Sequence, residues 1–212
     1  MADLNKLYES IVGGKLEPAI EVTKEVIAEN LNIQDVINNC MIKAMEEIGD
    51  RFQNQKAFVP ELLMAARAMK GALDLLKPHM KGENTAIIGK IVIGTVQGDL
   101  HDIGKNLVAS MFEGCGFEVI NLGVNISPEK FVEVVKTEKP DILCLSALLT
   151  TTMNNMKTVI TALEAAGLRD SVKVMVGGAP VNQMFADQIG ADGFSSNANA
   201  AVLKAKELLN VA

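Results

Sequence analysis

The residue in this sequence best suited to bind a metal is His101, which stands in the segment DLHDIG (99–104). A neutral imidazole is a good ligand for a borderline metal ion, and Asp99 is placed to accept a hydrogen bond from its other ring nitrogen. Such a bond would fix the tautomer and raise the basicity of the ligand. Gly104 has no side chain, so a bulky ligand could approach the backbone there. In an isolated D-x-H-x-x-G pattern, however, Asp99 or Asp102 is more often a helix cap beside a solvated histidine.

Small and polar residues stand at the ends of two further predicted strands. Ser146 and Leu148 end one of them, and Thr150–Thr152 follow at the turn into a helix. Gly177-Gly178 ends the other. Taken singly, the glycine pair is typical of a tight turn, and one of the later threonines is typical of a helix cap. Together, small groups on neighbouring strand ends predict a slot between them, at the same edge of the sheet as His101.

Two nucleotide-binding patterns are excluded by spacing. In a phosphate-binding loop, four residues separate the first glycine from the Gly-Lys pair, and Ser or Thr follows. Here Gly98 is separated by one residue more from Gly104-Lys105, and Asn106 follows. No G-x-G-x-x-G pattern follows the first predicted strand either. The sequence therefore offers no support for nucleotide or dinucleotide binding at this loop.

The elements that position these residues alternate from about residue 86 onward. Short apolar segments, typical of buried strands, alternate with segments of helical period. The expected strands are Ile87–Gly94, Phe117–Leu122, Asp141–Ala147, Val172–Gly177 and Ala191–Phe194. The expected helices between them are Ile103–Phe112, Pro128–Glu138, Thr152–Ala166 and Val181–Ile189. This order predicts an α/β fold with a Rossmann-like, flavodoxin-like five-stranded parallel sheet, which binds ligands outside the carboxyl ends of its strands.

The first part of the chain has a wholly helical pattern. Up to about residue 80, apolar residues recur at steps of three and four, as on one face of a helix. Gly13-Gly14 interrupts the first helical stretch, Asn32 is a suitable N-cap, and Pro60 suits a first helical turn. We expect a four-helix bundle, followed by a linker over residues 77–84 that has no period. The predicted domains are a helical cap domain with its linker at 1–84 and a Rossmann-like domain at 85–212.

Composition limits the classes of function. Hydrophobic residues make up 49% of the chain, as in globular proteins, and no apolar stretch reaches the roughly 18–20 residues that span a bilayer. The N-terminus lacks the basic and apolar segments of a signal peptide. Cys40, Cys115 and Cys144 fit neither a disulfide framework nor a zinc pattern. With a net charge of −6, the sequence favours a cytoplasmic protein with neither nucleic acid nor membrane as its partner.

Extended versions of the three motifs resemble a known family. The segments are GDLHDIGKN (98–106), SALLTTTM (146–153) and GGAPV (177–181). D-x-H-x-x-G followed by S-x-L and G-G resembles the cobalamin-binding motif of base-off, His-on B12 proteins. The longer segments resemble the corrinoid proteins of three-component methyltransferase systems, which serve growth on methylamines, methanol or methoxylated compounds. The same two-domain module occurs in cobalamin-dependent methionine synthase, and the resemblance extends over nearly the whole chain.

The resemblance implies a role for each motif residue. His101 would be the lower axial ligand of cobalt, in place of the cofactor's own dimethylbenzimidazole, and Asp99 its hydrogen-bond partner. Thr152 would end this relay, at a position where methionine synthase has serine. Ser146 and Gly177-Gly178 would line the slot for the displaced nucleotide tail. Further cofactor contacts are expected at Gly104, Leu148 and Thr150.

The helical domain is implied to cap the upper, methyl-bearing face of the corrinoid. The segments GDRF (49–52) and KAFVPEL (56–62) resemble the cap segment of the family. The residues expected over the cobalt-bound methyl group are Phe52, Phe58, Val59 and Leu62. The alternative for each of them is an ordinary place in the bundle core.

The implied function is that of a methyl carrier, a subunit of a methyltransferase system rather than a complete enzyme. A substrate:corrinoid methyltransferase would load a methyl group onto Co(I), and a second methyltransferase would pass it from methyl-Co(III) to tetrahydrofolate or a thiol. A reductive activase would be a third partner. The length of the chain and its short N-terminal region favour a methylamine or a methoxylated compound over methanol as the methyl donor.

Two other B12-dependent functions use similar domains. B12-dependent light or ligand sensors join a similar cap and sheet domain to a DNA-binding or signalling module, for which this sequence leaves no room. Mutase cobalamin subunits have no evident need for a helical cap. The sensor is the alternative to the methyl carrier.

Overall fold

The computed structural model describes residues 2–79 and 88–211, apart from the side chain of Lys77. The chain forms two compact units. The helical unit comprises Met1–Ile87 with Ser110–Phe117, and the sheet unit comprises Ile88–Ala109 with Glu118–Ala212. The predicted domain boundary after residue 84 and the predicted linker from residue 80 onward lie outside the described residues.

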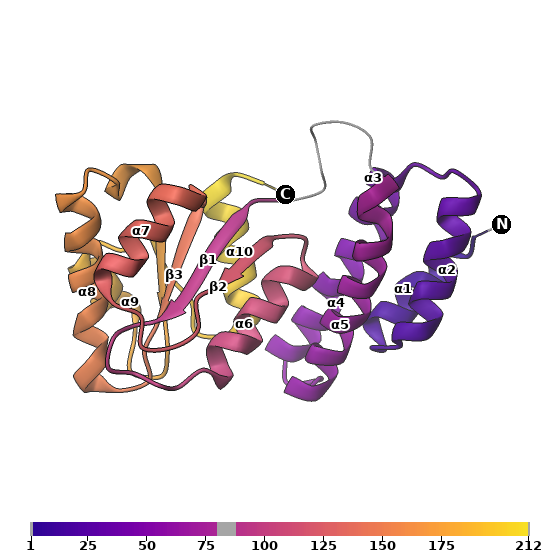
Figure 1. Cartoon of the computed structure of the whole chain (residues 1–212). Helices are drawn as coiled ribbons and strands as arrows, with labels where there is room; N and C mark the ends of the chain where they lie inside the picture. The colour runs from indigo at the N-terminus through magenta and orange to yellow at the C-terminus, as the bar shows by residue number, and fades with distance from the viewer. Residues whose placement is uncertain (1, 80–87, 212) are drawn as a thin grey trace. The chain divides into compact units, whose positions relative to one another are not determined.

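Up to residue 79, the helical unit has four helical stretches, which confirms the predicted bundle of helices, and the end of α6 (Ile103–Gly114) also belongs to this unit. The third stretch is continuous, but its middle turn is a π-helix. The elements are α1 (Leu4–Val12), α2 (Leu16–Ala28), α3 (Ile33–Val36) with the π-helix η1 (Ile37–Met41) and α4 (Ile42–Gln53), and α5 (Val59–Leu76) with the 3₁₀ helix η2 (Lys77–His79) (Figure 1).

The ends of these helices follow from local residue types. Gly14 has a φ of 65°, and a Cβ at this position would lie 2.4 Å from the Cβ of Met64, so glycine is required between α1 and α2. Asn32 caps α3 because its side chain accepts the backbone N–H of Asp35 at 3.2 Å. Pro60 is the second residue of α5, where its missing N–H costs no hydrogen bond.

The sheet unit has five parallel strands in the order β2-β1-β3-β4-β5, which confirms the flavodoxin-like prediction. Its elements are β1 (Lys90–Thr95), α6 (Ile103–Gly114), β2 (Glu118–Asn121), α7 (Pro128–Glu138), β3 (Ile142–Ser146), α8 (Thr150–Ala165), η3 (Arg169–Ser171), β4 (Lys173–Gly177), α9 (Gln183–Ile189), β5 (Gly193–Phe194) and α10 (Ala198–Leu209).

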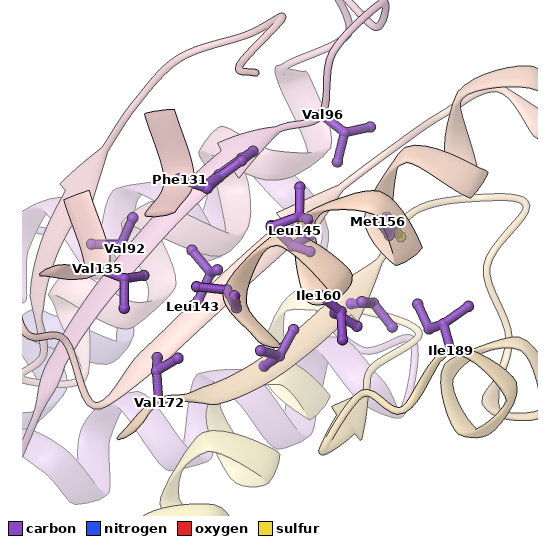
Figure 2. Packing of buried hydrophobic residues seen from close by; sticks show 14 of the residues in the cluster. Val92, Val96, Phe131, Val135, Leu143, Leu145, Met156, Ile160, Val172 and Ile189 are labelled. Carbon is purple, nitrogen blue, oxygen red and sulfur yellow. The ribbon is translucent and has the colours of Figure 1, made fainter. Parts of the chain in front are cut away.

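Helices cover both faces of this sheet. In Figure 1, α7, α8 and α9 lie on one side of the strands, and α10 lies on the other side together with the start of α6. Alternate strand residues point to the first face, where they pack against these three helices (Figure 2). The buried cluster includes Val92, Leu143, Leu145, Val174, Val176, Phe131, Met156, Ile160 and Ile189. Because both faces are covered, the loops at the strand ends are the places where the sheet can meet a ligand.

The starts of α8 and α9 differ from expectation, and α9 begins at Gln183 rather than Val181 because Asn182 caps it. The start of α7 agrees with the sequence, since Ser127 caps it. The start of α8 does not: Leu149 is its N-cap residue and makes no side-chain capping bond, so the interpretation of Thr151 or Thr152 as a cap is wrong. The helix α10, which begins after the capping residue Asn197, was not predicted.

The three cysteines are buried, and none of them forms a disulfide. Burial raises the pKa of the Cys40 thiol to about 11 and that of the Cys144 thiol to about 12. No helix in the described ranges is both long and apolar enough to cross a bilayer.

Candidate functional site

The DLHDIG segment joins β1 to α6 at the carboxyl edge of the sheet. β1 lies between β2 and β3, so the order of the strands changes direction there. In open parallel sheets this switch point is where ligands bind, because the connections on its two sides run to opposite faces. Gly98 turns the chain out of β1 with a φ of 82°, a left-handed value that favours glycine.

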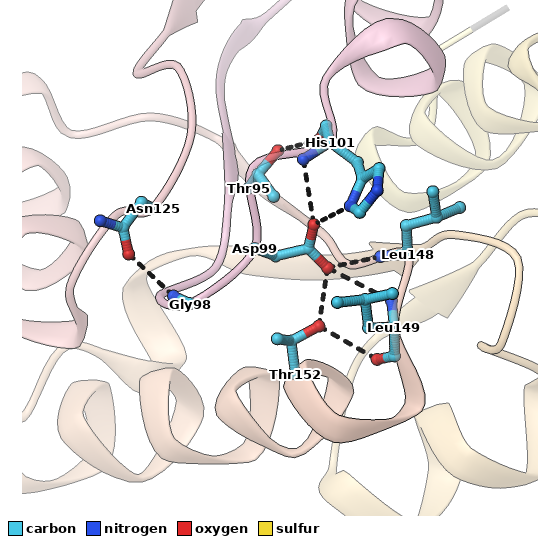
Figure 3. Close-up of polar contacts among 8 residues, drawn as sticks. All are labelled: Thr95, Gly98, Asp99, His101, Asn125, Leu148, Leu149 and Thr152. Atoms are coloured by element: carbon cyan, nitrogen blue, oxygen red, sulfur yellow. Dashed lines mark hydrogen bonds and ion pairs between the residues drawn. The ribbon is translucent and has the colours of Figure 1, made fainter.

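Asp99 is the centre of the polar contacts in this loop (Figure 3). Its side chain is wholly buried, and both carboxylate oxygens accept hydrogen bonds. Oδ1 accepts the backbone N–H of His101 at 3.0 Å and lies 2.7 Å from His101 Nδ1. Oδ2 accepts the Thr152 hydroxyl at 2.6 Å and the backbone N–H groups of Leu148 and Leu149 at 2.8 and 3.3 Å. The structure thus joins Thr152, Asp99 and His101 in one hydrogen-bonded chain.

These contacts hold Asp99 as a carboxylate. Burial alone would raise its pKa, but hydrogen bonds from Thr152 and from the backbone of His101 and Leu148 outweigh burial and hold the pKa of Asp99 well below its ordinary value. An ionised Asp99 accepts the proton of His101 Nδ1, and this tautomer leaves a lone pair on Nε2. Because the imidazole is about half exposed, Nε2 can reach a metal that approaches from outside.

The backbone of the loop is held as well. Thr95, at the end of β1, donates its hydroxyl to the carbonyl oxygen of His101 at 3.0 Å. Asn125, in the loop after β2, accepts the N–H of Gly98 at 2.8 Å and donates its own N–H to the carbonyl oxygen of Asp99 at 3.0 Å. Sequence reasoning missed Thr95 and Asn125, because their signal is a contact between loops far apart in the chain.

The residues predicted to line a slot lie together at the strand ends. Thr95, Ser146 and Gly177 form one row in register across β1, β3 and β4, so their positions face the same side of the sheet. Gly178 follows with a φ of 132°. A Cβ there would lie 1.8 Å from the carbonyl oxygen of Ala147, so only glycine lets the two strand ends approach this closely.

The surface near the imidazole is open and apolar. A Cβ added to Gly104 would meet no atom within 4 Å, so the first turn of α6 faces open space. Leu100 and Ile103 are 71% and 88% exposed, and Leu148 and Leu149 are exposed too. Gathered at one edge, such side chains indicate a site for a ligand with a broad apolar surface. Of these four residues, only Leu148 was predicted to contact a ligand, although leucine and isoleucine in a polar loop were a usable signal.

Two further residues complete this edge. Thr150, the first residue of α8, is exposed, as its predicted contact with a ligand requires. Met184, near the start of α9 after the glycine pair, is 75% exposed and was also missed. Both stand just beyond the carboxyl ends of strands, on the same edge of the sheet as His101.

The predicted cap residues belong to the helical unit and differ in burial. Phe58 is 69% exposed, Val59 is exposed too, and Phe52 is partly buried. Leu62 has no exposed surface, which supports the alternative of a core position for this residue. The N–H of Phe58 donates to the Glu61 carboxylate at 2.8 Å, so the start of α5 is fixed at this point.

Comparison with known proteins places both units in one family. Two family models, each described as a B12 binding domain, match residues 3–77 and 89–203. The chain is 43% identical over 208 residues to trimethylamine corrinoid protein 2 of Methanosarcina mazei, which covers 97% of this chain and 95% of that protein. It is 40% identical over 215 residues to a corrinoid protein of Desulfitobacterium hafniense, which covers 99% of this chain and 98% of that protein.

Two solved structures share the fold over nearly the whole chain. A cobalamin-binding protein from Desulfitobacterium hafniense has a TM-score of 0.83 and 35% identity, covering 98% of this chain and 99% of that chain. A chain of the methanol:cobalamin methyltransferase complex from Methanosarcina barkeri has a TM-score of 0.85 and 27% identity, covering 98% of this chain and 79% of that chain. These relatives and structures match the chain over nearly its whole length, in sequence and in fold. The chain belongs to the B12-binding family of corrinoid proteins.

Proposed function

We propose that this chain is a methyl carrier, which binds a corrinoid and takes part in methyl transfer from a methylamine to an acceptor. The observation that carries the proposal is the hydrogen-bonded chain of Thr152, Asp99 and His101, which presents one ring nitrogen at the open edge of the sheet. A relative named trimethylamine corrinoid protein and a structural neighbour from a methanol:cobalamin methyltransferase complex support the methyl-carrier role.

The residues at the edge of the sheet fit a corrinoid in three respects. His101 offers a single imidazole nitrogen, which suits a metal that brings its other ligands in a macrocycle. The exposed apolar side chains of Leu100 and Ile103 suit the broad face of a corrin ring. The small residues Ser146 and Gly177 suit a nucleotide tail that has left the cobalt and lies against the sheet.

Each residue of the site has a defined part in this proposal. When bound, the corrinoid supplies the chemistry, because its cobalt accepts a methyl group as a nucleophile and gives it up to an acceptor. His101 would hold the cobalt through Nε2, in the base-off, His-on form, and Asp99 would keep the proton on Nδ1, which makes Nε2 a stronger donor. Thr152 fixes the position of the Asp99 carboxylate. The contacts to the ring and its tail come from Gly104, Ser146, Leu148, Thr150, Gly177 and Gly178.

Three partners belong to the proposal. One methyltransferase takes the methyl group from its substrate, and a second delivers it to tetrahydrofolate or a thiol. A reductive activase restores cobalt that has been oxidised. Relatives named trimethylamine and dimethylamine corrinoid proteins, each 43% identical to this chain, favour a methylamine as the substrate.

Spectroscopy of the purified chain with added cob(II)inamide, which has no dimethylbenzimidazole to ligate the cobalt, tests the binding site. We expect the EPR splitting that one ligating ring nitrogen produces. His101→Ala should bind the cofactor without this splitting, whereas His79→Ala, which removes the only other histidine in the sequence, should keep it. A His101→Ala spectrum that equals the wild-type spectrum would refute the assignment of the ligand.

A panel of purified substrate:corrinoid methyltransferases tests the methyl-carrier role. The chain loaded with cobalamin should accept a methyl group from a methylamine methyltransferase. Loading only by an enzyme for methanol or methoxylated compounds would show that the proposed donor is wrong. No loading by any member of the panel, with a change of state under light when adenosylcobalamin is bound, would favour the sensor alternative.

A further inference from the structure

Asn125 holds the backbone on both sides of the Asp99 side chain, although it comes from a different loop, and Figure 3 shows its bond to Gly98. Its side-chain Oδ1 accepts the N–H of Gly98 at 2.8 Å, and its own N–H donates to the carbonyl oxygen of Asp99 at 3.0 Å. These two bonds join the loop after β2 to the loop that carries His101. The Asp99 carboxylate is held from the opposite direction, by Thr152 on α8. Asp99 is therefore fixed between the connections on either side of β1.

The residue type at position 125 matches the conformation that this contact needs. Asn125 has a φ of 56°, in the left-handed region that asparagine adopts more readily than most residues with a side chain. Glycine would adopt the same backbone conformation but would lack the acceptor for Gly98. A β-branched residue would be strained at this φ. Asparagine thus supplies both the backbone conformation and the acceptor that hold Gly98 and Asp99.

Other hydrogen bonds hold the loop as well. Within the turn itself, the backbone N–H of Asp99 donates to the carbonyl oxygen of Val96 at 3.2 Å. Asn155 on α8 donates to the carbonyl oxygen of Gln97 at 2.7 Å, and Thr95 donates to the carbonyl oxygen of His101 at 3.0 Å. Those bonds hold the two ends of the loop, and Asn125 holds its middle. His101 follows Asp99 by two residues, so a displacement of this backbone moves the imidazole.

We propose that Asn125 is a positioning residue for His101, which fixes the imidazole at the place where its bond to cobalt is strongest. This role rests on the proposed function, and it assigns the loop after β2 a part in the strength of the axial bond. Asn125 itself touches neither the imidazole nor Thr152 through any hydrogen bond that the structure contains among its described residues. Its effect passes through the backbone at Gly98 and Asp99.

The reduction potential of bound cobalamin measures this effect. Co(II) keeps an axial base and Co(I) releases it, so a weaker bond to His101 makes the Co(II)/Co(I) midpoint less negative. Asn125→Gly removes the acceptor and keeps the left-handed backbone. We expect the ratio of His-on to His-off protein to fall about threefold to tenfold, as for the loss of one neutral hydrogen bond. At 59 mV per tenfold for a one-electron couple, the midpoint rises by about 28–59 mV.

Two controls separate positioning from a general effect on the fold. In the His101→Ala background, Asn125→Gly should leave the midpoint unchanged, because there is no axial bond to weaken. Asn30→Gly makes the same change at a left-handed asparagine of the helical unit and should also leave it unchanged. Asn125→Ser has a shorter side chain, which draws the acceptor away from Gly98, so the midpoint should rise in this variant too.

Hydrogen exchange of the chain without cofactor tests the contact directly. The Gly98 amide should exchange faster in Asn125→Gly than in the wild type, and at the wild-type rate in Asn125→Asp, which keeps an acceptor. Two outcomes would overturn the positioning role alone. In the first, Asn125→Gly has the same midpoint as a wild type that is His-on. In the second, Asn125→Gly shifts the midpoint by the same amount in the His101→Ala background as in the wild-type background. A wild type without any histidine ligation would overturn the proposed function, and the positioning role with it.

Discussion

Removal of the Thr152 hydroxyl tests the hydrogen-bonded chain in the protein without its cofactor. Valine has the shape of threonine, so Thr152→Val removes the 2.6 Å bond to Asp99 without creating a cavity. Thr152 is 6% exposed and Asp99 is wholly buried, so water cannot replace the lost donor. A hydrogen bond to a charged group contributes about 1.5–3 kcal/mol, and we expect the unfolding free energy to fall by this amount at pH 7.

Thr152→Ser is the matched control, because it keeps the hydroxyl and removes only the methyl group. Loss of one buried methyl group costs about 0.8–1 kcal/mol, so the expected order of stability is wild type, then Thr152→Ser, then Thr152→Val. Urea unfolding followed by circular dichroism measures the free energies. Hydrogen exchange of the β3 peptide assigns the transition to the sheet unit. A Thr152→Val protein as stable as Thr152→Ser would refute the view that the hydroxyl holds Asp99.

The same comparison has a defined pH dependence. The pKa of Asp99 is lowered in the folded protein, so its ionisation stabilises the fold at pH values above its unfolded pKa of about 3.9. This stabilisation is lost as the pH falls toward the folded pKa. The unfolded state is the same in both proteins, so the difference in unfolding free energy between wild type and Thr152→Val should be constant from about pH 5 to 8 and should narrow only once the pH falls below the folded pKa of Asp99 in the variant. A difference that grows in acid would contradict the assigned direction of the pKa shift.

Gly178→Ala should destabilise the sheet unit by about 2–4 kcal/mol, because the added Cβ would overlap the carbonyl oxygen of Ala147. Gly104→Ala should cost no stability, because the added Cβ meets no atom, and should weaken only corrinoid binding in equilibrium dialysis. Leu62→Ala should cost the helical unit about 2–5 kcal/mol in urea unfolding, and Phe58→Ala less than about 1 kcal/mol. If Phe58 shields the methyl group, Phe58→Ala should speed the photolysis of bound methylcobalamin with little loss of stability, unlike Leu62→Ala. An unchanged photolysis rate would show that Phe58 does not cover the methyl group. Cys144, whose thiol pKa burial raises to about 12, should react with iodoacetamide at pH 8 only after unfolding, and rapid labelling of the native protein would contradict this.

The strands and their ends were predictable because a parallel sheet is buried on both faces. Such strands read as continuous apolar runs, and the first polar or small residue after each run marks its carboxyl end. The prediction Asp141–Ala147 thus differs by one residue at each end from β3 (Ile142–Ser146). The bounds of α7 agree with the prediction because Ser127 and Pro128 define its start by local chemistry alone.

Contacts between distant loops were beyond sequence reasoning. The bond from Asn125 to Gly98 depends on a left-handed φ and on the alignment of two loops, and neither leaves a periodic trace. The cap residues show a different limit. Apolar residues occur on most sides of the first turns of α5, so the helical period does not distinguish the buried Leu62 from the exposed Phe58 and Met64.

The row formed by Thr95, Ser146 and Gly177 has a further consequence, because its side chains decrease in size from β1 to β4. The next row along the strands, Ile93, Cys144 and Met175, is buried. In the first row Thr95 is buried too, whereas Ser146 and Gly177 are partly exposed. The free space at this edge therefore lies beside β3 and β4 rather than beside β1. For the proposed function, this asymmetry means that a slender part of a ligand would fit at the ends of β3 and β4 and would be kept away from the end of β1.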